Sequence, residues 1–126
     1  MQNSQLIQRI AYYYVDSLLW SIEVNFDRKD LSPDAVTTII EDCTSFVNAV
    51  IEKYGSKFVE QYQVELGHDF CMTRNGEGLG FWDGDWDQLT DDNGDWLTEL
   101  ANTYHQINPY YGDDNQIYLE KENKHV

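Results

Sequence analysis

The chain has 126 residues, of which 41% are hydrophobic and only two are proline. This size fits one domain with one core, spanning residues 1–126. Lys and Arg total 8 against 23 Asp and Glu, so the formal net charge is -15, which excludes direct nucleic-acid binding through a basic patch. An aromatic content of 14% separates the chain from disordered acidic tails. No apolar run is long enough to span a membrane and no signal-peptide pattern is present, so we expect a cytoplasmic protein that binds no membrane.

The first half of the chain has helical periodicity. Apolar residues from Gln5 to Ile22 recur at helical spacing and predict a first helix. A second helix is predicted to begin after the N-cap and first-turn proline Ser32-Pro33 and to end at Gly55. A short third helix is predicted over 57–62, ended by a loop around Gly67. The predicted buried face of the second helix comprises Val36, Ile39, Ile40, Cys43, Val47, Val50, Ile51 and Tyr54.

The second half has short aromatic runs separated by glycine, which predict strands. Residues 69–74 and 79–83 flank Asn75-Gly76-Glu77-Gly78, a hairpin signal. A last helix is predicted over 95–105 and a closing hairpin over 110–119.

The predicted fold class is therefore α+β. N-terminal helices (1–66) pack on a small antiparallel sheet of about four strands (67–120), with one further helix between the two hairpins. Residues 121–126 are expected to form a frayed tail.

The two cysteines, Cys43 and Cys71, are 28 residues apart in different predicted elements, without a C-x-x-C pair. We predict two buried free thiols, with a disulfide as the alternative. The same spacing disfavours a zinc site, and no cofactor is predicted.

The most distinctive stretch runs from Gly67 to Asp83 and reads GHDFCMTRNGEGLGFWD. It resembles the hallmark G-H-D-F-x-x-T-R-N-G-x-G-x-G-F-W-D of a family of small uncharacterised bacteriophage proteins. This chain has Cys71-Met72 and Glu77 where members commonly have Trp-Leu and a second His. The resemblance implies a phage-encoded protein in the host cytoplasm that acts on host machinery. The hallmark residues, whose role the family leaves unknown, include His68, Asp69, Phe70, Thr73, Arg74, Asn75, Gly76 and Trp82.

A catalytic interpretation would make His68 a base oriented by Asp69, with Arg74 binding an anionic substrate. Adjacent residues on an extended segment point to opposite faces, so His68 and Asp69 would not face each other. Arg74 can instead pair with a neighbouring carboxylate. No nucleophile elbow or phosphate loop is present, so we predict no enzyme activity and no catalytic residues.

Asp83, Asp85 and Asp87 have the spacing of positions 1, 3 and 5 of a calcium loop. The sixth position is Gln88 instead of Gly, and the twelfth is Gly94 instead of Glu. We therefore predict no metal site and interpret the run as a solvated acidic loop. The three aspartates remain the candidates if a divalent cation binds.

The acidic residues are concentrated in one part of the chain. Between Glu65 and Glu99 there are ten acids and one base, Arg74. Spread evenly, the net charge would reach only about a quarter of the charge density of duplex DNA, so imitation of DNA requires clustering. Of the interleaved tryptophans, we expect Trp82 and Trp96 in the sheet core and Trp86 exposed.

We hypothesise that the protein binds and inhibits a basic, nucleic-acid-handling host protein by imitating DNA. The alternative is a divalent-metal or small-ligand site, or a minor enzyme, built on His68, Asp69, Arg74 and residues 83–87. Two further interpretations are that the charge serves solubility only, and that the hallmark is a fold signature with the function on the helical half. The predicted partner-binding residues are Asp83, Asp85, Trp86, Asp87, Asp91, Asp92, Asp95 and Glu99.

Overall fold

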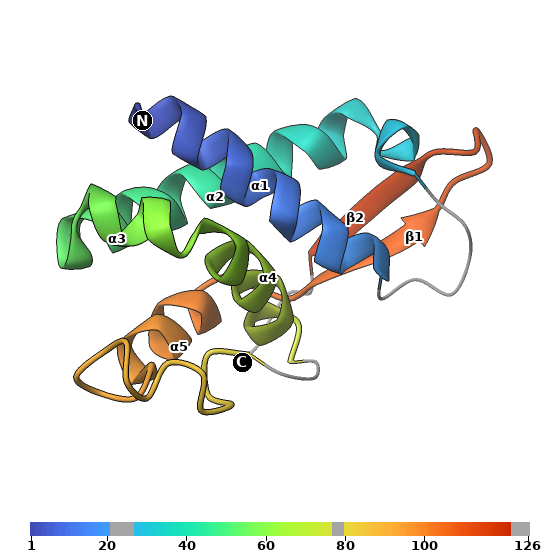
Figure 1. Ribbon diagram of the computed structural model, residues 1–126. Coiled ribbons are helices and arrows are strands. Elements are labelled where there is room, and N and C mark those ends of the chain that lie inside the picture. The colour runs from blue at the N-terminus through green and yellow to red at the C-terminus, as the bar shows by residue number, and fades with distance from the viewer. Residues whose placement is uncertain (21–26, 77–79, 122–126) are drawn as a thin grey trace.

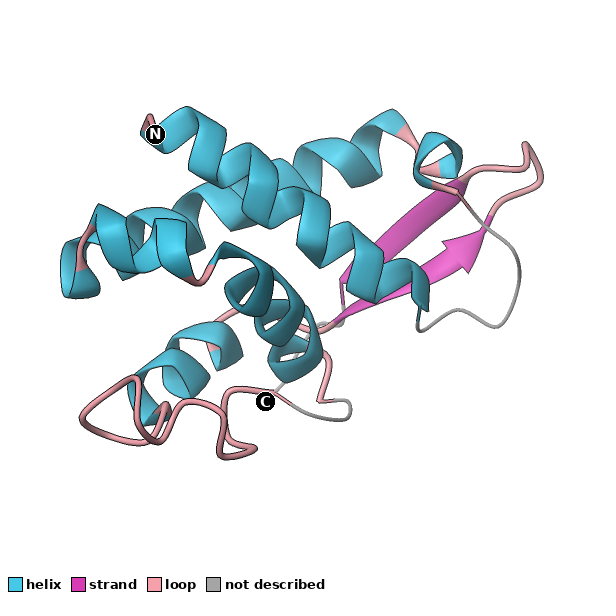
Figure 2. Cartoon of the chain, in the orientation of Figure 1, coloured by secondary structure: helices cyan, strands magenta, loops and turns pink. Residues whose placement is uncertain are grey.

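The computed structural model describes residues 1–20, 27–76 and 80–121. This part of the chain forms five α-helices, one 3-10 turn and one two-stranded hairpin (Figures 1 and 2). The α+β class is confirmed, and the described residues are mostly helical. The sheet of about four strands is wrong, because the described residues contain two strands. None of the helices in these ranges is long and apolar enough to span a membrane. In chain order the elements are α1 (Asn3–Trp20), η1 (Arg28–Asp30), α2 (Pro33–Tyr54), α3 (Ser56–Gln61), α4 (Gln63–Arg74), α5 (Asp95–Asn102), β1 (Ile107–Tyr111) and β2 (Ile117–Lys121).

The first three helices follow the sequence signals. The Ser32 hydroxyl accepts a hydrogen bond from the backbone N–H of Ala35 at 3.0 Å and caps α2. Gly55 ends α2 with a φ of 95°, a value that favours glycine. The first helix ends at Trp20, and the predicted end at Ile22 lies outside the described residues.

The predicted buried face of α2 is too wide. Ile39, Cys43 and Val47 are buried, but Val36 is 44% and Ile40 38% exposed. They line a groove between α1 and α2 of about 220 Å³, together with Tyr12. Helical periodicity identifies an apolar stripe, but how much of the stripe is covered depends on the neighbouring helix.

Helix α4 replaces the predicted first hairpin. Residues 69–74 are helical, so the strand prediction for them is wrong, and the predicted turn and second strand lie partly in residues 77–79, which are outside the described ranges. Most of the helix is buried, so it lacks the polar face that marks a helix in sequence. Gly67 does not end a helix: a Cβ there would lie 2.6 Å from the Ile10 carbonyl oxygen. The glycine therefore allows α4 to lie against α1, as Figure 1 shows.

The closing hairpin is confirmed. Strands β1 and β2 pair antiparallel, with Tyr110 opposite Tyr118. The hairpin is joined to the start of α2, where the Ser32 N–H donates to the Ile117 carbonyl at 2.8 Å.

The last helix, α5, is shorter than the predicted 95–105. Between α4 and α5, residues 80–94 form an irregular stretch that we call the acidic loop. Two of its aromatic residues, Phe81 and Trp86, are buried in the core. The Phe81 ring lies 6.1 Å from Phe46, which stacks on Phe70 at 4.0 Å. The core thus joins the helical half to the segment that follows it.

Candidate functional site: the acidic loop and its polar network

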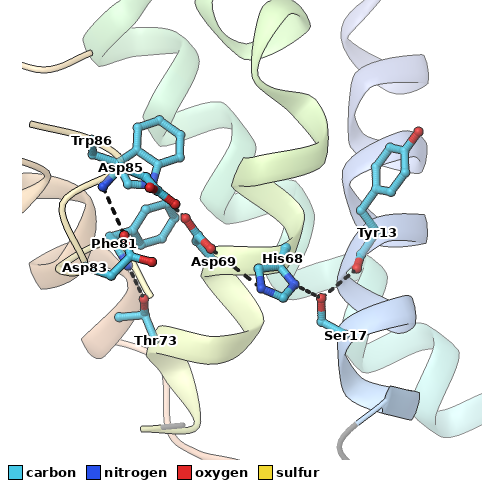
Figure 3. A network of polar contacts seen from close by, with 9 residues as sticks. All are labelled: Tyr13, Ser17, His68, Asp69, Thr73, Phe81, Asp83, Asp85 and Trp86. Carbon is cyan, nitrogen blue, oxygen red and sulfur yellow. Dashed lines mark hydrogen bonds and ion pairs between the residues drawn. The ribbon is translucent and has the colours of Figure 1, made fainter. Parts of the chain in front are cut away.

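The acidic loop is attached to α4 by two side chains. The Thr73 hydroxyl accepts a hydrogen bond from the backbone N–H of Phe81 at 3.0 Å. The indole N–H of Trp86 donates to Asp69 Oδ2 at 2.6 Å (Figure 3). Within the loop, the Thr90 hydroxyl accepts from the Gly94 N–H at 2.7 Å. These bonds give the loop a defined conformation.

The expected environments of two tryptophans are reversed. Trp86 is 1% exposed, so the expectation that it projects into solvent is wrong. Trp82 is 48% exposed, so its assignment to a sheet core is also wrong. The Trp82 ring covers the backbone of Gly80, where a Cβ would collide with it. Trp96 lies on α5, partly buried, with its ring 5.7 Å from that of Tyr54. Alternating acids predicted exposure for Trp86, but a sequence pattern cannot show which aromatic side chain finds a buried partner.

Most predicted partner-binding acids are at the surface. The exposed ones are Asp85, Asp87, Asp91, Asp95 and Glu99, whereas Asp83 and Asp92 are partly buried. No Lys or Arg occurs between residues 80 and 99, and among residues 1–20, 27–76 and 80–121 no ion pair involves any of these seven acids. We call residues 83–99 the acidic segment. Figure 1 shows the loop and α5 together at one end of the molecule, away from the hairpin.

His68 and Asp69 lie on a helix and not on a strand, so the argument that they point to opposite faces is wrong. His68 Nε2 lies 3.9 Å from Asp69 Oδ1. On its other side, His68 Nδ1 lies 2.6 Å from the hydroxyl of Ser17 on α1. That hydroxyl also donates to the Tyr13 carbonyl at 3.2 Å. Ser17 was not among the predicted site residues, because a serine inside an amphipathic helix gives no signal of a contact 51 residues away.

Asp69 is only 5% exposed. Burial raises the pKa of its carboxyl group to about 7, the hydrogen bond from Trp86 lowers it, and the nearby carboxylates of Asp83, Asp85 and Glu65 raise it. A carboxyl group with this pKa exchanges a proton near neutral pH.

Arg74 is the buried charge partner that its sequence context suggested. Its Nη2 lies 2.7 Å from Asp42 Oδ2, and its Nε donates to the His105 carbonyl at 2.8 Å. The Arg74 side chain is 1% exposed. It is therefore inaccessible to an anionic substrate, which corrects its place in the alternative ligand site.

Other hallmark residues hold elements together. Phe70 packs in the core between Phe46 and Tyr14. The Asn75 side-chain oxygen accepts a hydrogen bond from the Ile107 N–H at 3.0 Å and so joins the end of α4 to β1. Gly76 follows with a φ of 65°.

The three aspartates with calcium-loop spacing, Asp83, Asp85 and Asp87, belong to the acidic loop. Asp83 Oδ1 accepts a hydrogen bond from the Asp85 N–H at 3.1 Å. In the described ranges, no group of three or more His, Cys, Asp or Glu side chains is arranged to hold a metal ion.

Both cysteines are buried free thiols, as predicted. Burial raises the pKa of the Cys43 thiol, which disfavours the reactive thiolate form.

A surface pocket of about 290 Å³ lies beside His68 and is also lined by Asp16, Ser17 and Trp20. Asp16 forms an ion pair with Arg28. The pocket offers an indole, an imidazole and a carboxylate to a small ligand.

Comparison of the chain with protein families, with curated proteins and with solved structures finds no match.

Proposed function

We propose that this protein binds a basic, nucleic-acid-handling protein through its acidic segment and competes there with nucleic acid. The observation that carries the proposal is an acidic loop that is anchored to the core and contains no basic residue. A surface of fixed carboxylates attracts a cationic partner over several ångströms and orients its approach.

The distribution of charge supports a local interface. The exposed surface of 7499 Å² carries a net charge of -15, or one charge per about 500 Å², far below the density of DNA. Six aspartates between residues 83 and 95 raise the local density. The acidic segment is therefore the part of the surface best suited to bind a partner's phosphate-binding site.

Trp82 takes the role of aromatic anchor that the sequence assigned to Trp86. It is half-exposed, precedes Asp83, and its ring is held against Gly80. A preorganised tryptophan beside carboxylates suits the side chain of a partner arginine or lysine, which combines cation–π contact with ion pairing.

The resemblance to phage proteins suggests the setting of this interaction. A phage-encoded acidic protein in the host cytoplasm would inhibit or modulate a host protein. A small-ligand site is the second candidate, favoured by the pocket beside His68. The buried Arg74 is not part of it.

The test is capture of partners from host lysate by three proteins: the wild type, a loop variant and a charge-matched control. The loop variant carries Asn at Asp85, Asp87, Asp91 and Asp92. The control removes the same charge elsewhere on the surface, at exposed positions, by D34N, E41Q, E52Q and D113N.

The wild type and the control should recover one basic nucleic-acid-binding protein, with recovery that falls as salt rises and as duplex DNA is added. The loop variant should lose it. Equal recovery by the loop variant would show that the acidic segment is not the interface. Recovery that responds to a small ligand and not to salt would favour the second candidate.

A further inference from the structure

Asp69 lies where three parts of the molecule meet. It belongs to α4, its Oδ2 accepts the hydrogen bond from Trp86 of the acidic loop, and its Oδ1 faces His68. His68 in turn contacts Ser17 of α1 at 2.6 Å. Figure 3 shows this continuous chain of polar contacts from α1 through α4 to the loop.

The charges around Asp69 are mainly negative. Glu65 on α4 and Asp83 and Asp85 on the loop act on its carboxyl group. Among the described residues, His68 is the one basic side chain within ion-pair distance of Asp69. Tyr62, the titratable side chain that precedes α4, packs edge-on against the ring of Trp86. An ionised Asp69 is therefore a buried charge among like charges.

The hydrogen bond from Trp86 needs an acceptor but not a charge. A neutral carboxyl group accepts it through one oxygen, and its proton removes the repulsion from Asp83 and Asp85. An ionised carboxylate accepts a stronger bond from Trp86, which lowers the pKa of Asp69. Its desolvation and the repulsion from the neighbouring carboxylates outweigh that gain and raise the pKa. The two protonation states thus hold the loop with different free energies.

We propose that Asp69 is a proton-controlled latch: while it is neutral the acidic loop stays closed on α4 through Trp86, and when it loses its proton the loop opens more often. The latch is a property of the free protein. It goes beyond the proposed function and stands whether or not the acidic segment binds a basic partner.

The direction of the pH effect follows from proton linkage. In the closed state the pKa of Asp69 is raised to about 7, whereas opening exposes the group and returns its pKa toward about 4. The closed state therefore binds the proton more tightly. Its extra stability is complete below about pH 4 and is lost as the pH rises to about 7.

The experiment measures hydrogen exchange and the NMR resonance of the Trp86 indole N–H in the full chain between pH 5 and 8.5, with exchange corrected for its intrinsic pH dependence. In the wild type the resonance should titrate with a midpoint near pH 7, and protection should fall about tenfold or more between pH 5 and 7.5. In Asp69→Asn, the amide oxygen accepts the same bond without a charge, so protection should change less than about twofold.

Two further variants keep the test decisive if Asp69→Asn does not fold. Asp85→Asn should lower the midpoint, because it removes one carboxylate that raises the pKa of Asp69. Asp87→Asn is the matched control, since Asp87 is an exposed acid of the same loop, and should leave the midpoint in place. The latch is overturned if Asp69→Asn keeps the wild-type pH dependence, if the wild-type midpoint lies below pH 5, or if the two loop variants behave alike.

Discussion

Helix α4 carries two buried charged side chains of opposite sign, Asp69 and Arg74, each 5% exposed. Arg74 has an ion-pair partner, Asp42, and a carbonyl acceptor, His105. Asp69 has an indole donor and a histidine at 3.9 Å, with three further carboxylates acting on it. The same degree of burial therefore has different consequences: a compensated charge holds the fold together, whereas an uncompensated one responds to pH.

The largest expected effect comes from removing the compensated buried charge, Arg74. Arg74→Met should lower the free energy of unfolding by about 3–5 kcal/mol, because it leaves Asp42 without its buried cation. Chemical denaturation measures the loss. Arg9→Met, at an exposed position of α1, should change stability by less than about 0.5 kcal/mol. Similar values for the two variants would mean that the Arg74–Asp42 ion pair contributes little to stability.

Removing the hydrogen bond to the uncompensated charge, Asp69, should lower the free energy of unfolding by a smaller amount. Trp86→Phe keeps an aromatic ring in the core but removes the donor to Asp69, so we expect a loss of about 1–3 kcal/mol. Trp82→Phe is the matched control, because its ring is half-exposed and its N–H has no hydrogen bond in the described part of the structure. Urea titrations should separate the two variants. An equally large loss for Trp82→Phe would contradict the conclusion that the hydrogen bond from Trp86 to Asp69 attaches the loop to α4.

Gly67→Ala tests whether the position of α4 depends on its approach to α1. Alanine gains about 1 kcal/mol of helix propensity over glycine, but its Cβ would lie 2.6 Å from the Ile10 carbonyl oxygen and 2.8 Å from Tyr13 Cβ. The cost of moving the two helices apart should exceed that gain. We expect a net loss of about 1–3 kcal/mol in the free energy of unfolding, measured by thermal unfolding. The Ser17–His68 contact should weaken as well, visible as a shift of the His68 ring resonances. A stabilised variant would show that the helices tolerate the added methyl group.

The smallest effect is expected in the acidic loop itself. Asp87 and Asp91 are exposed, so replacing both by Asn should change stability by less than about 0.5 kcal/mol. The circular dichroism melting curve should be nearly unchanged. A loss above about 1 kcal/mol would assign these acids to the fold and weaken the case that they serve a partner.

Local signals predicted much of the helical half and the last hairpin. The Ser32-Pro33 start and the Gly55 end of α2 were readable because caps depend on residues that are close in sequence. The Asn-Gly signal after Arg74 was misleading, because the residues before it form a helix that is buried on most sides and therefore lacks a polar stripe.

For the candidate site, composition and spacing alone determined the concentration of carboxylates between residues 65 and 99 and the absence of a complete calcium loop. Only the tertiary structure decided that Trp86 is buried and Trp82 exposed, that Arg74 pairs with Asp42, and that Ser17 meets His68. Each of these outcomes depends on which side chains from distant segments meet. These contacts are set by the packing of α4 against α1 and α2 and of the acidic loop against α4, which no local pattern in the sequence encodes.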